Sequence, residues 1–353
     1  MSNASRAFLL GPLLKGVSRS FYLTLRVLPA GMRDPIGLAY LLARAADTIA
    51  DTSLIAPSQR LELLLALRAQ VNGNANASTA PMQRIAAEVA AHQLQSDEKT
   101  LLESLDPALA VLAQLDDADR AAVRGIVTTL TEGMEFDLRT FPDEQSGERV
   151  ALREIAELDR YTYLVAGCVG EFWTRMTCLH LPGTLRAPEA TMCERGIRFG
   201  QALQMTNVLR DCAKDLRIGR CYLPSALLER HGLQPDDLLA PDASRRAQPV
   251  LFELVRHALG QFRDALDYTL AIPRFSLRLR LACIWPIVIG LRTMRLLVDN
   301  AQWLDPAQPS KVRRNDVYAV IARSLPSAMS DAALRGWIGG LIGEIEARLA
   351  RAT

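Results

Sequence analysis

The sequence is poor in the residues that several protein classes depend on. Aromatic side chains make up only 6% of it, and Ala and Leu dominate its apolar residues, which favours helices over a β-sandwich. The four histidines are scattered and the six cysteines form no Cys-x-x-Cys pair, so no zinc site is expected. The cysteines fit the reduced thiols of a cytoplasmic protein.

Long apolar segments and a strong net charge are also missing. The longest apolar run, Leu281 to Leu291, is far shorter than the roughly 20 residues of a membrane span. The first residues lack the flanks and the apolar length of a secretory signal. A formal net charge of +2 gives no support to a nucleic-acid partner. We therefore expect a cytoplasmic protein without a transmembrane segment, at most peripheral to a membrane.

What the chain does have is helical periodicity along nearly its whole length. We expect one helix to begin at Asp34-Pro35, others to cover 117–139 and 188–216, and an apolar helix to bend near Gly167. Hydrophobic residues make up 49% of the chain, and no repeat or break in composition marks a second domain. We predict one all-α domain over residues 1–353, with its core at about 15–325, as a monomer or homodimer.

Two acidic pairs stand out, because Asp47/Asp51 and Asp211/Asp215 are the only Asp-x-x-x-Asp pairs in the chain. In a helix, this spacing places two like charges on one face, one turn apart. Each pair also continues a polar stripe at helical spacing. The stripes are Tyr40, Arg44, Asp47 and Asp51 in the first helix, and Gly200, Gln204, Asn207, Asp211 and Asp215 in the second. Apolar residues surround both stripes, which predicts that the helices are buried and the stripes face a cavity.

A single pair of this kind is usually a solvated helix face, and Gly200 could serve only to let helices pack closely. A tyrosine such as Tyr161 is likewise more often a core residue than a catalytic one. Two matched pairs favour a different interpretation, in which Mg²⁺ ions compensate four carboxylates. A cavity with such a polar end and apolar walls suits an amphiphile with a diphosphate head and a hydrocarbon tail.

Four motifs, in this order along the chain, resemble the squalene/phytoene synthase family. They are Ser18-Arg19-Ser20-Phe21, Tyr40-x-x-x-Arg44-x-x-Asp47-x-x-x-Asp51, Tyr161-x-x-x-Val165-Ala166-Gly167 and Gln204-x-x-Asn207-x-x-Arg210-Asp211-x-x-x-Asp215. The resemblance implies the all-helical isoprenoid synthase fold, with the two acidic helices facing each other across a central cavity. It also implies a head-to-head condensation of two prenyl diphosphates.

The resemblance assigns roles to individual residues. The metal ligands would be Asp47, Asp51, Asn207, Asp211 and Asp215, and the catalytic residues Tyr40, Arg44 and Tyr161. The substrate-binding residues would be Ser18, Arg19, Phe21, Tyr40, Arg44, Val165, Gln204, Asn207, Arg210, Arg220 and Pro286. The contacts to NADPH would be Ser18, Arg19, Arg210, Lys311 and Arg313.

Two segments indicate a branch of the family. Lys311-Val312-Arg313 resembles the Lys-x-Arg segment that squalene synthases use for NADPH, and Ala282 to Pro286 resembles a Cys-Ala-Ile-Pro stretch of the same branch. They favour squalene formation from two farnesyl diphosphates with Mg²⁺ and NADPH. Ala50, Lys214 and Ser276-Leu277 depart from that branch. The alternatives are phytoene or dehydrosqualene synthesis without a reductant, presqualene diphosphate synthesis, and a non-catalytic helical protein that binds prenyl diphosphates.

Overall fold

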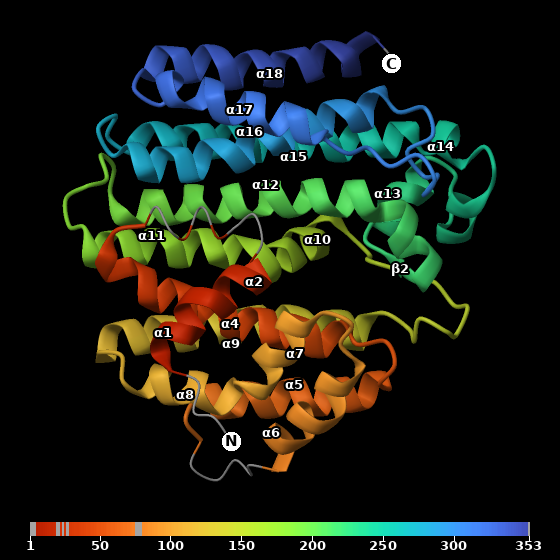
Figure 1. Ribbon diagram of the computed structural model, residues 1–353. Coiled ribbons are helices and arrows are strands. Elements are labelled where there is room, and N and C mark those ends of the chain that lie inside the picture. The colour runs from red at the N-terminus through yellow and green to blue at the C-terminus, as the bar shows by residue number, and fades with distance from the viewer. Residues whose placement is uncertain (1–4, 19–21, 23–24, 26–27, 75–79, 352–353) are drawn as a thin grey trace. The chain divides into compact units, whose positions relative to one another are not determined.

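The computed structural model describes residues 5–18, 22, 25, 28–74 and 80–351, and these are almost entirely helical (Figure 1). The predicted all-α class is confirmed. The chain divides into two compact units, Met1–Thr140 and Phe141–Thr353, which we call unit 1 and unit 2. That they form one domain stays a prediction.

Unit 1 holds the first acidic helix. Its elements are α1 (Arg6–Phe8), η1 (Leu9–Leu13), α2 (Leu14–Ser18), α4 (Ala30–Asp51), α5 (Pro57–Val71), α6 (Ala80–Arg84), η2 (Ile85–Val89), η3 (Ala90–His92), α7 (Ser96–Glu103), α8 (Leu105–Ala113) and α9 (Asp117–Thr140). α4 packs against α5, α7, α8 and α9, so the first acidic pair lies on the central helix of this unit.

The start of α4 differs from the prediction. The helix begins at Ala30, after Pro29 in an extended conformation, and Pro35 lies inside it. The expectation that Asp34-Pro35 starts the helix is therefore wrong. A proline this early removes only the hydrogen bond to the carbonyl one turn before it, so the start can lie upstream. α4 ends at Asp51, the last residue of the acidic pair.

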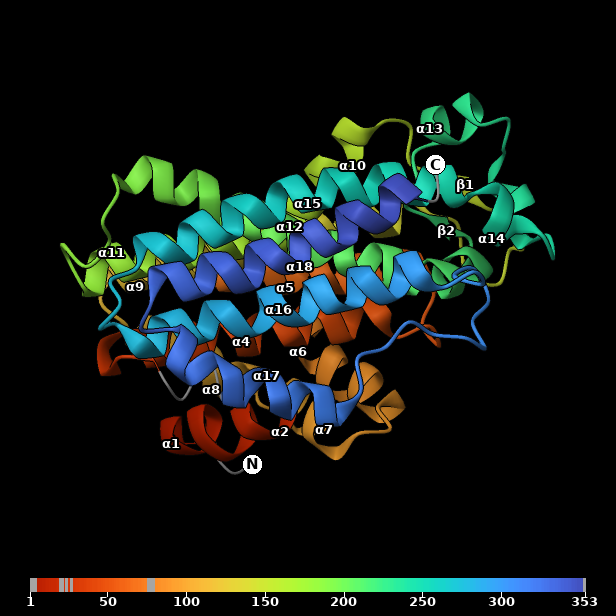
Figure 2. The same ribbon diagram turned by 90° about the horizontal axis from the view of Figure 1, so that it is seen from above.

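Unit 2 holds the second acidic helix. Its elements are β1 (Val150–Ala151), α10 (Ile155–Thr162), η4 (Tyr163–Gly167), α11 (Cys168–His180), α12 (Glu189–Asp215), η5 (Leu216–Ile218), β2 (Arg220–Cys221), α13 (Ser225–Arg230), η6 (Pro235–Leu239), α14 (Ala243–Arg246), α15 (Gln248–Ala271), α16 (Leu277–Asp299), α17 (Arg314–Ser327) and α18 (Asp331–Arg351). Seen from above, α12, α15, α16 and α18 run alongside one another (Figure 2).

The centre of unit 2 is α12, which packs against α11, η4, α15 and α16. Gly200 lies where α12 meets η4, because a Cβ on this residue would overlap the backbone carbonyl of Ala166. The glycine of the second stripe therefore serves close helix packing, one of the two roles considered for it. η4 itself is a π-helical segment between α10 and α11, and it lies where the sequence predicted a bend near Gly167.

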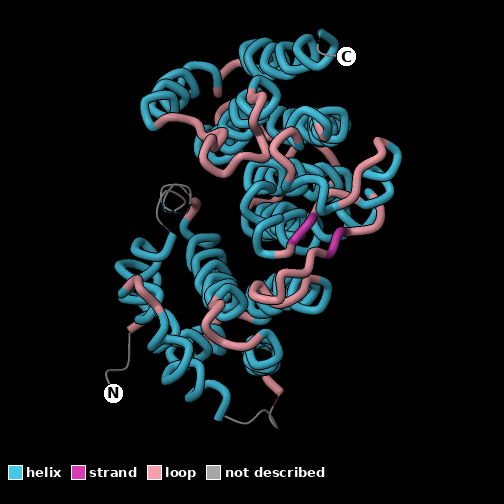
Figure 3. Tube along the Cα trace, turned by 90° about the vertical axis from the view of Figure 1, so that its right-hand side faces the viewer, coloured by secondary structure: helices cyan, strands magenta, loops and turns pink. Residues whose placement is uncertain are grey.

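A short parallel pair of strands closes unit 2 beside the end of α12. Val150 pairs with Arg220 and Ala151 with Cys221 (Figure 3). Gly219 precedes the second strand with a φ of 86°, a left-handed conformation that favours glycine. This turn directs the chain from the acidic helix into the strand that carries Arg220.

The longest apolar helix belongs to the core of unit 2. Among the described residues, α16 is the one helix long and apolar enough to cross a membrane, yet 61% of its apolar window is buried within the protein. It packs against α12, α15, α17 and α18. Its apolar character is thus accounted for by packing in the unit.

Candidate active site

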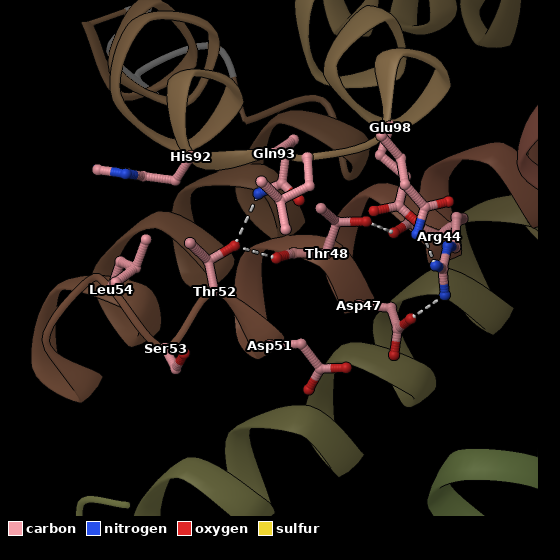
Figure 4. Close-up of a pocket in the computed structure, with 12 residues that line it drawn as sticks. Arg44, Asp47, Thr48, Asp51, Thr52, Ser53, Leu54, His92, Gln93 and Glu98 are labelled. Carbon is pink, nitrogen blue, oxygen red and sulfur yellow. Dashed lines mark hydrogen bonds and ion pairs between the residues drawn. The ribbon is translucent and has the colours of Figure 1, made fainter. Parts of the chain in front are cut away.

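Three of the four residues of the first acidic stripe, Arg44, Asp47 and Asp51, line a cavity in unit 1. Tyr40, Arg44 and Asp47 are half-buried and Asp51 is exposed, whereas the residues that flank them on α4 are buried, as the sequence predicted. The cavity has a volume of about 540 Å³ (Figure 4). It is lined by Arg44, Asp47, Thr48, Asp51, Thr52, Ser53, Leu54, His92, Gln93, Leu94, Gln95 and Glu98.

Arg44 is held between two carboxylates of this cavity. Its Nη1 donates to Asp47 Oδ2 at 2.6 Å, and its Nη2 donates to Glu98 Oε1 on α7. Burial alone would lower the pKa of Arg44, but the hydrogen bond to Glu98 and the charge of Asp47 raise it above its usual value. The guanidinium is thus fixed in its charged form beside the acidic pair.

The surroundings of Asp47 disfavour its ionised form. Burial and the charge of Asp51 together raise the pKa of Asp47 to about 6, although the charge of Arg44 lowers it. A cation between the two carboxylates would stabilise the ionised form of Asp47. Carboxylate oxygens on an open cavity are ligands that suit Mg²⁺, which also takes water and phosphate oxygens.

Glu98 is a residue of this site that the sequence did not indicate. It lies on the first turn of α7, and only 9% of it is exposed. It forms no motif with Asp47 or Asp51, because it reaches Arg44 from a different helix. The one signal in the sequence is a carboxylate in the first turn of a short helix, which is common at surfaces.

The second acidic stripe repeats the first on α12. Gln204, Asn207, Asp211 and Asp215 are half-buried, and the residues between them on either side are mostly buried. Asn207 Nδ2 donates to Gln204 Oε1 at 3.2 Å. Five of the predicted residues, these four and Arg210, thus lie on one helix of unit 2. That the two acidic helices face each other stays a prediction.

Arg210 neutralises part of this charge. Its Nε donates to Asp211 Oδ1 at 3.0 Å and its Nη2 to Asp211 Oδ2 at 2.5 Å, so both carboxylate oxygens are engaged. Lys214, which departs from the squalene synthase pattern, is exposed on the same turn. The second stripe therefore has positively charged side chains on its own helix.

Arg220 and Tyr161 are linked through Tyr222. Arg220 lies in β2, two residues before Tyr222, and the ring of Tyr222 contacts Tyr161. Arg220 Nη2 donates to Glu144 Oε1 at 2.9 Å, and both side chains are 15% exposed. The ring of Tyr161 is buried and stacks on Tyr222 with centroids 4.7 Å apart. Phe141 meets the edge of Tyr222 at 4.9 Å. Tyr161 is thus set in an aromatic wall, and its predicted catalytic role stays a prediction.

The remaining predicted residues are distributed over both units. Ser18 is buried in unit 1 and its hydroxyl donates to the carbonyl of Leu14, while Tyr40 Oη lies 3.4 Å from the carbonyl of Val17. In unit 2, Val165 and Pro286 are partly buried, and Lys311 and Arg313 are exposed before α17. Arg19 and Phe21 lie outside the described residues.

All six cysteines are free, and five of them are buried. Burial raises the pKa of Cys221 and of Cys283 to about 12, so both are neutral thiols at physiological pH. They are packing residues of unit 2, as the prediction of reduced thiols required.

Comparisons with known proteins agree with the motifs. A family model described as squalene/phytoene synthase matches residues 14–316. Squalene synthase ERG9 of Gibberella zeae is 26% identical over 290 residues, which are 81% of this chain and 58% of the relative. The bifunctional lycopene cyclase/phytoene synthase of Pyrenophora tritici-repentis is 29% identical over 262 residues, which are 74% of this chain and 41% of the relative.

The fold is also similar to that of solved structures. TcSQS in complex with the ligand BPH1237 superposes with a TM-score of 0.74 and 21% identity, covering 99% of this chain and 92% of that one. The chain spans between 41% and 66% of the length of the curated relatives it matches.

Proposed function

The chain belongs to the squalene/phytoene synthase family, and we propose that it condenses two farnesyl diphosphates head to head, through presqualene diphosphate, to squalene. The observation that carries the proposal is the recurrence of one acidic stripe, half-buried between apolar flanks, on α4 and on α12. A chain that only packed helices would gain nothing from two such stripes, since each places like charges one turn apart.

The residues suit a Mg²⁺ ion that is bound jointly by the protein and the substrate, and not one that protein side chains enclose completely. Among the described residues, no group of three or more His, Cys, Asp or Glu side chains forms a complete metal site. Mg²⁺ commonly takes one or two carboxylates and completes its shell with water and substrate phosphates. In the proposed site, Asp47 and Asp51 supply such a pair, and Asp211 and Asp215, with Asn207, supply the other.

The first step is the ionisation of one farnesyl diphosphate. Bound Mg²⁺ would supply neutralisation of the charge that grows on the departing pyrophosphate. Arg44, Arg210 and Arg220 donate hydrogen bonds to the same oxygens, for which a planar guanidinium is suited. The carbon–oxygen bond breaks, the pyrophosphate leaves with the electron pair, and an allylic cation remains.

The second step joins the two chains. The allylic cation bonds to the 2,3 double bond of the other farnesyl diphosphate, and loss of a proton closes the cyclopropane of presqualene diphosphate. Tyr161 takes this proton and passes it to the released pyrophosphate, since a phenol of ordinary pKa is a poor final base. Tyr40 lies beside the cation, and apolar side chains such as Val165 exclude water.

The reductive half of the reaction is the finer part of the proposal. Lys311 and Arg313 are exposed basic residues just before α17, which fits contacts to the phosphates of NADPH. Ser18, Arg19 and Arg210 complete the proposed set. The second pyrophosphate leaves presqualene diphosphate with its electron pair, and the cyclopropane of the resulting cation opens. Bound NADPH would supply the hydride that turns the rearranged cation into squalene. We place the protein in the cytoplasm, where its hydrocarbon product would pass to a membrane.

A second candidate is phytoene synthesis, which the similarity to a bifunctional lycopene cyclase/phytoene synthase favours. Product analysis separates the two. Purified protein with Mg²⁺ is incubated with farnesyl or geranylgeranyl diphosphate, each with and without NADPH, and the products are identified by mass. Squalene formed only with NADPH supports the proposal. Phytoene from geranylgeranyl diphosphate, dehydrosqualene despite NADPH, or arrest at presqualene diphosphate would each replace it with the corresponding synthase.

A further inference from the structure

Three turns between helices meet at one end of unit 2. They are the α11–α12, α15–α16 and α17–α18 turns, which Figure 1 shows at the same end of this unit. The fully buried Arg280 joins two of them, since it donates to the carbonyl of Ala328 at 2.9 Å and to Asp331 Oδ1 at 2.6 Å. Arg186 joins the third, through its amide to the carbonyl of Ala271 at 3.0 Å and an ion pair with Asp331 at 3.5 Å.

Large apolar side chains project from these turns. Phe275 in the α15–α16 turn is 76% exposed, and Met329 in the α17–α18 turn is 55% exposed. Leu325 and Tyr318 on α17 are 50% and 63% exposed. Tyr318 and Leu325 are seven residues apart and so share one face of α17, and Met329 follows in the turn after this helix. Single exposed apolar residues are ordinary, but several of them on two turns that Arg280 joins are not.

Unpaired positive charge surrounds these side chains. The guanidinium of Arg274 lies over the ring of Phe275, 5.0 Å from its centroid, and Arg278 follows one turn later. Both arginines are exposed, and neither forms an ion pair within 4.0 Å with another described residue, although the charge of Arg274 helps to lower the pKa of Asp331. The one carboxylate that joins the turns, Asp331, is already engaged by Arg280 and Arg186. We call Phe275, Leu325, Met329, Arg274 and Arg278 the basic turn surface.

We propose that the basic turn surface docks unit 2 on an anionic lipid bilayer. Aromatic and aliphatic side chains enter the boundary between headgroups and acyl chains, while arginines stay with the anionic headgroups. A second copy of the chain fits less well, because a two-fold contact of this surface with itself would bring arginines against arginines. Docking of this kind is peripheral, since α16 stays in the core of unit 2. It does not depend on the proposed reaction.

The test is sedimentation of the full chain with vesicles, without Mg²⁺ or substrate. Vesicles of phosphatidylcholine and phosphatidylglycerol in equal parts should bind the protein, and phosphatidylcholine vesicles should bind it weakly. Arg274→Gln with Arg278→Gln should lower the partition coefficient by about fivefold per arginine. Phe275→Ser with Met329→Ser should lower it by about tenfold or more. In Phe275→Trp, the indole emission should shift to shorter wavelength on anionic vesicles.

Matched controls lie elsewhere on the surface. Leu65→Ser changes an exposed leucine on α5 of unit 1, and Arg230→Gln with Arg245→Gln removes two exposed arginines of unit 2. These variants should bind vesicles like the original chain, and unfolding midpoints show that each variant folds. Binding that is absent, that is equal on both vesicle types, or that the controls weaken as much as the test variants overturns the proposal. So does self-association that Phe275→Ser abolishes while vesicle binding is unchanged, which would assign the surface to a second copy.

Discussion

The two acidic helices share a pattern but compensate its charge differently. On α4, Arg44 pairs with Asp47 and also with Glu98, which belongs to another helix. On α12, Arg210 takes both oxygens of Asp211, and no second carboxylate pairs with Arg210 among the described residues. The same spacing therefore gives one stripe that depends on tertiary packing and one that is largely self-contained. Six substitutions, grouped in four predictions, follow from this contrast.

The largest expected effect is on turnover. Asp47→Asn and Asp211→Asn should each lower kcat/KM for farnesyl diphosphate by about a hundredfold or more, because each removes a carboxylate from the charge that stabilises the leaving pyrophosphate. Steady-state product formation at saturating Mg²⁺ measures this. Asp267→Asn is the matched control, since Asp267 is an aspartate of unit 2 that also pairs with an arginine, Arg335, at 3.9 Å. Full turnover in either test variant would contradict a role of that helix in metal binding.

The second contrast lies under the ends of the two helices. Arg60, only 1% exposed, donates to the carbonyl of Ala50 at 2.9 Å, next to Asp51. Arg217, which is exposed, donates to the carbonyl of Ala213 near Asp215. Arg60→Met should lower the free energy of unfolding by about 2 kcal/mol, since it leaves a buried carbonyl without a donor.

Arg217→Met should cost less than about 0.5 kcal/mol, because water can replace the exposed donor. Denaturant unfolding of both variants measures the difference. Equal losses would contradict the view that the first acidic helix depends more on its packing than the second.

The sequence predicted the stripes well because both signals are local. Helical spacing and apolar flanks fix which side chains share a face, so Asp47, Asp51, Asp211 and Asp215 were found without any tertiary information. Likewise, the sequence indicated an irregular helix near Gly167, where the structure has the π-helical segment η4. The start of α4 was missed because Pro35 fits either the first turn of a helix or a position slightly further inside it.

The partners of the arginines could not be predicted in this way. Glu98 reaches Arg44 through the packing of α7 on α4, and Glu144 reaches Arg220 in the part of unit 2 closed by the β1–β2 pair. Strands of two residues have no periodicity to detect, and a single glutamate has no motif. Long-range ion pairs of this kind follow from the fold and not from the spacing.

The third contrast concerns Glu98 itself. Glu98→Gln should raise the Mg²⁺ concentration for half-maximal activity by about tenfold. Asp47 alone would then balance the charge of Arg44, so Arg44 would compete more strongly with the cation for Asp47. The affinity of Mg²⁺ with inorganic pyrophosphate, measured by calorimetry, should fall in parallel. Glu88→Gln, an exposed glutamate of unit 1 that also pairs with an arginine, is the control. An unchanged Mg²⁺ requirement would show that Glu98 does not position Arg44.

The smallest expected effect is on the pH dependence of stability beside α4. Burial alone would raise the pKa of Glu135 on α9, but hydrogen bonds from Arg68 and Arg139 outweigh it and lower the pKa below its usual value. A carboxylate with a lowered pKa in the folded state stabilises the protein above its unfolded pKa, near 4.5, and this contribution is lost as the pH falls through the lowered value. Glu135→Gln should therefore lower the free energy of unfolding at neutral pH by less than about 1 kcal/mol, since the groups are partly exposed. In acid it should leave the free energy of unfolding unchanged. Thermal unfolding from neutral to acidic pH measures this, and a loss that persists in acid would assign the role of Glu135 to packing instead of charge.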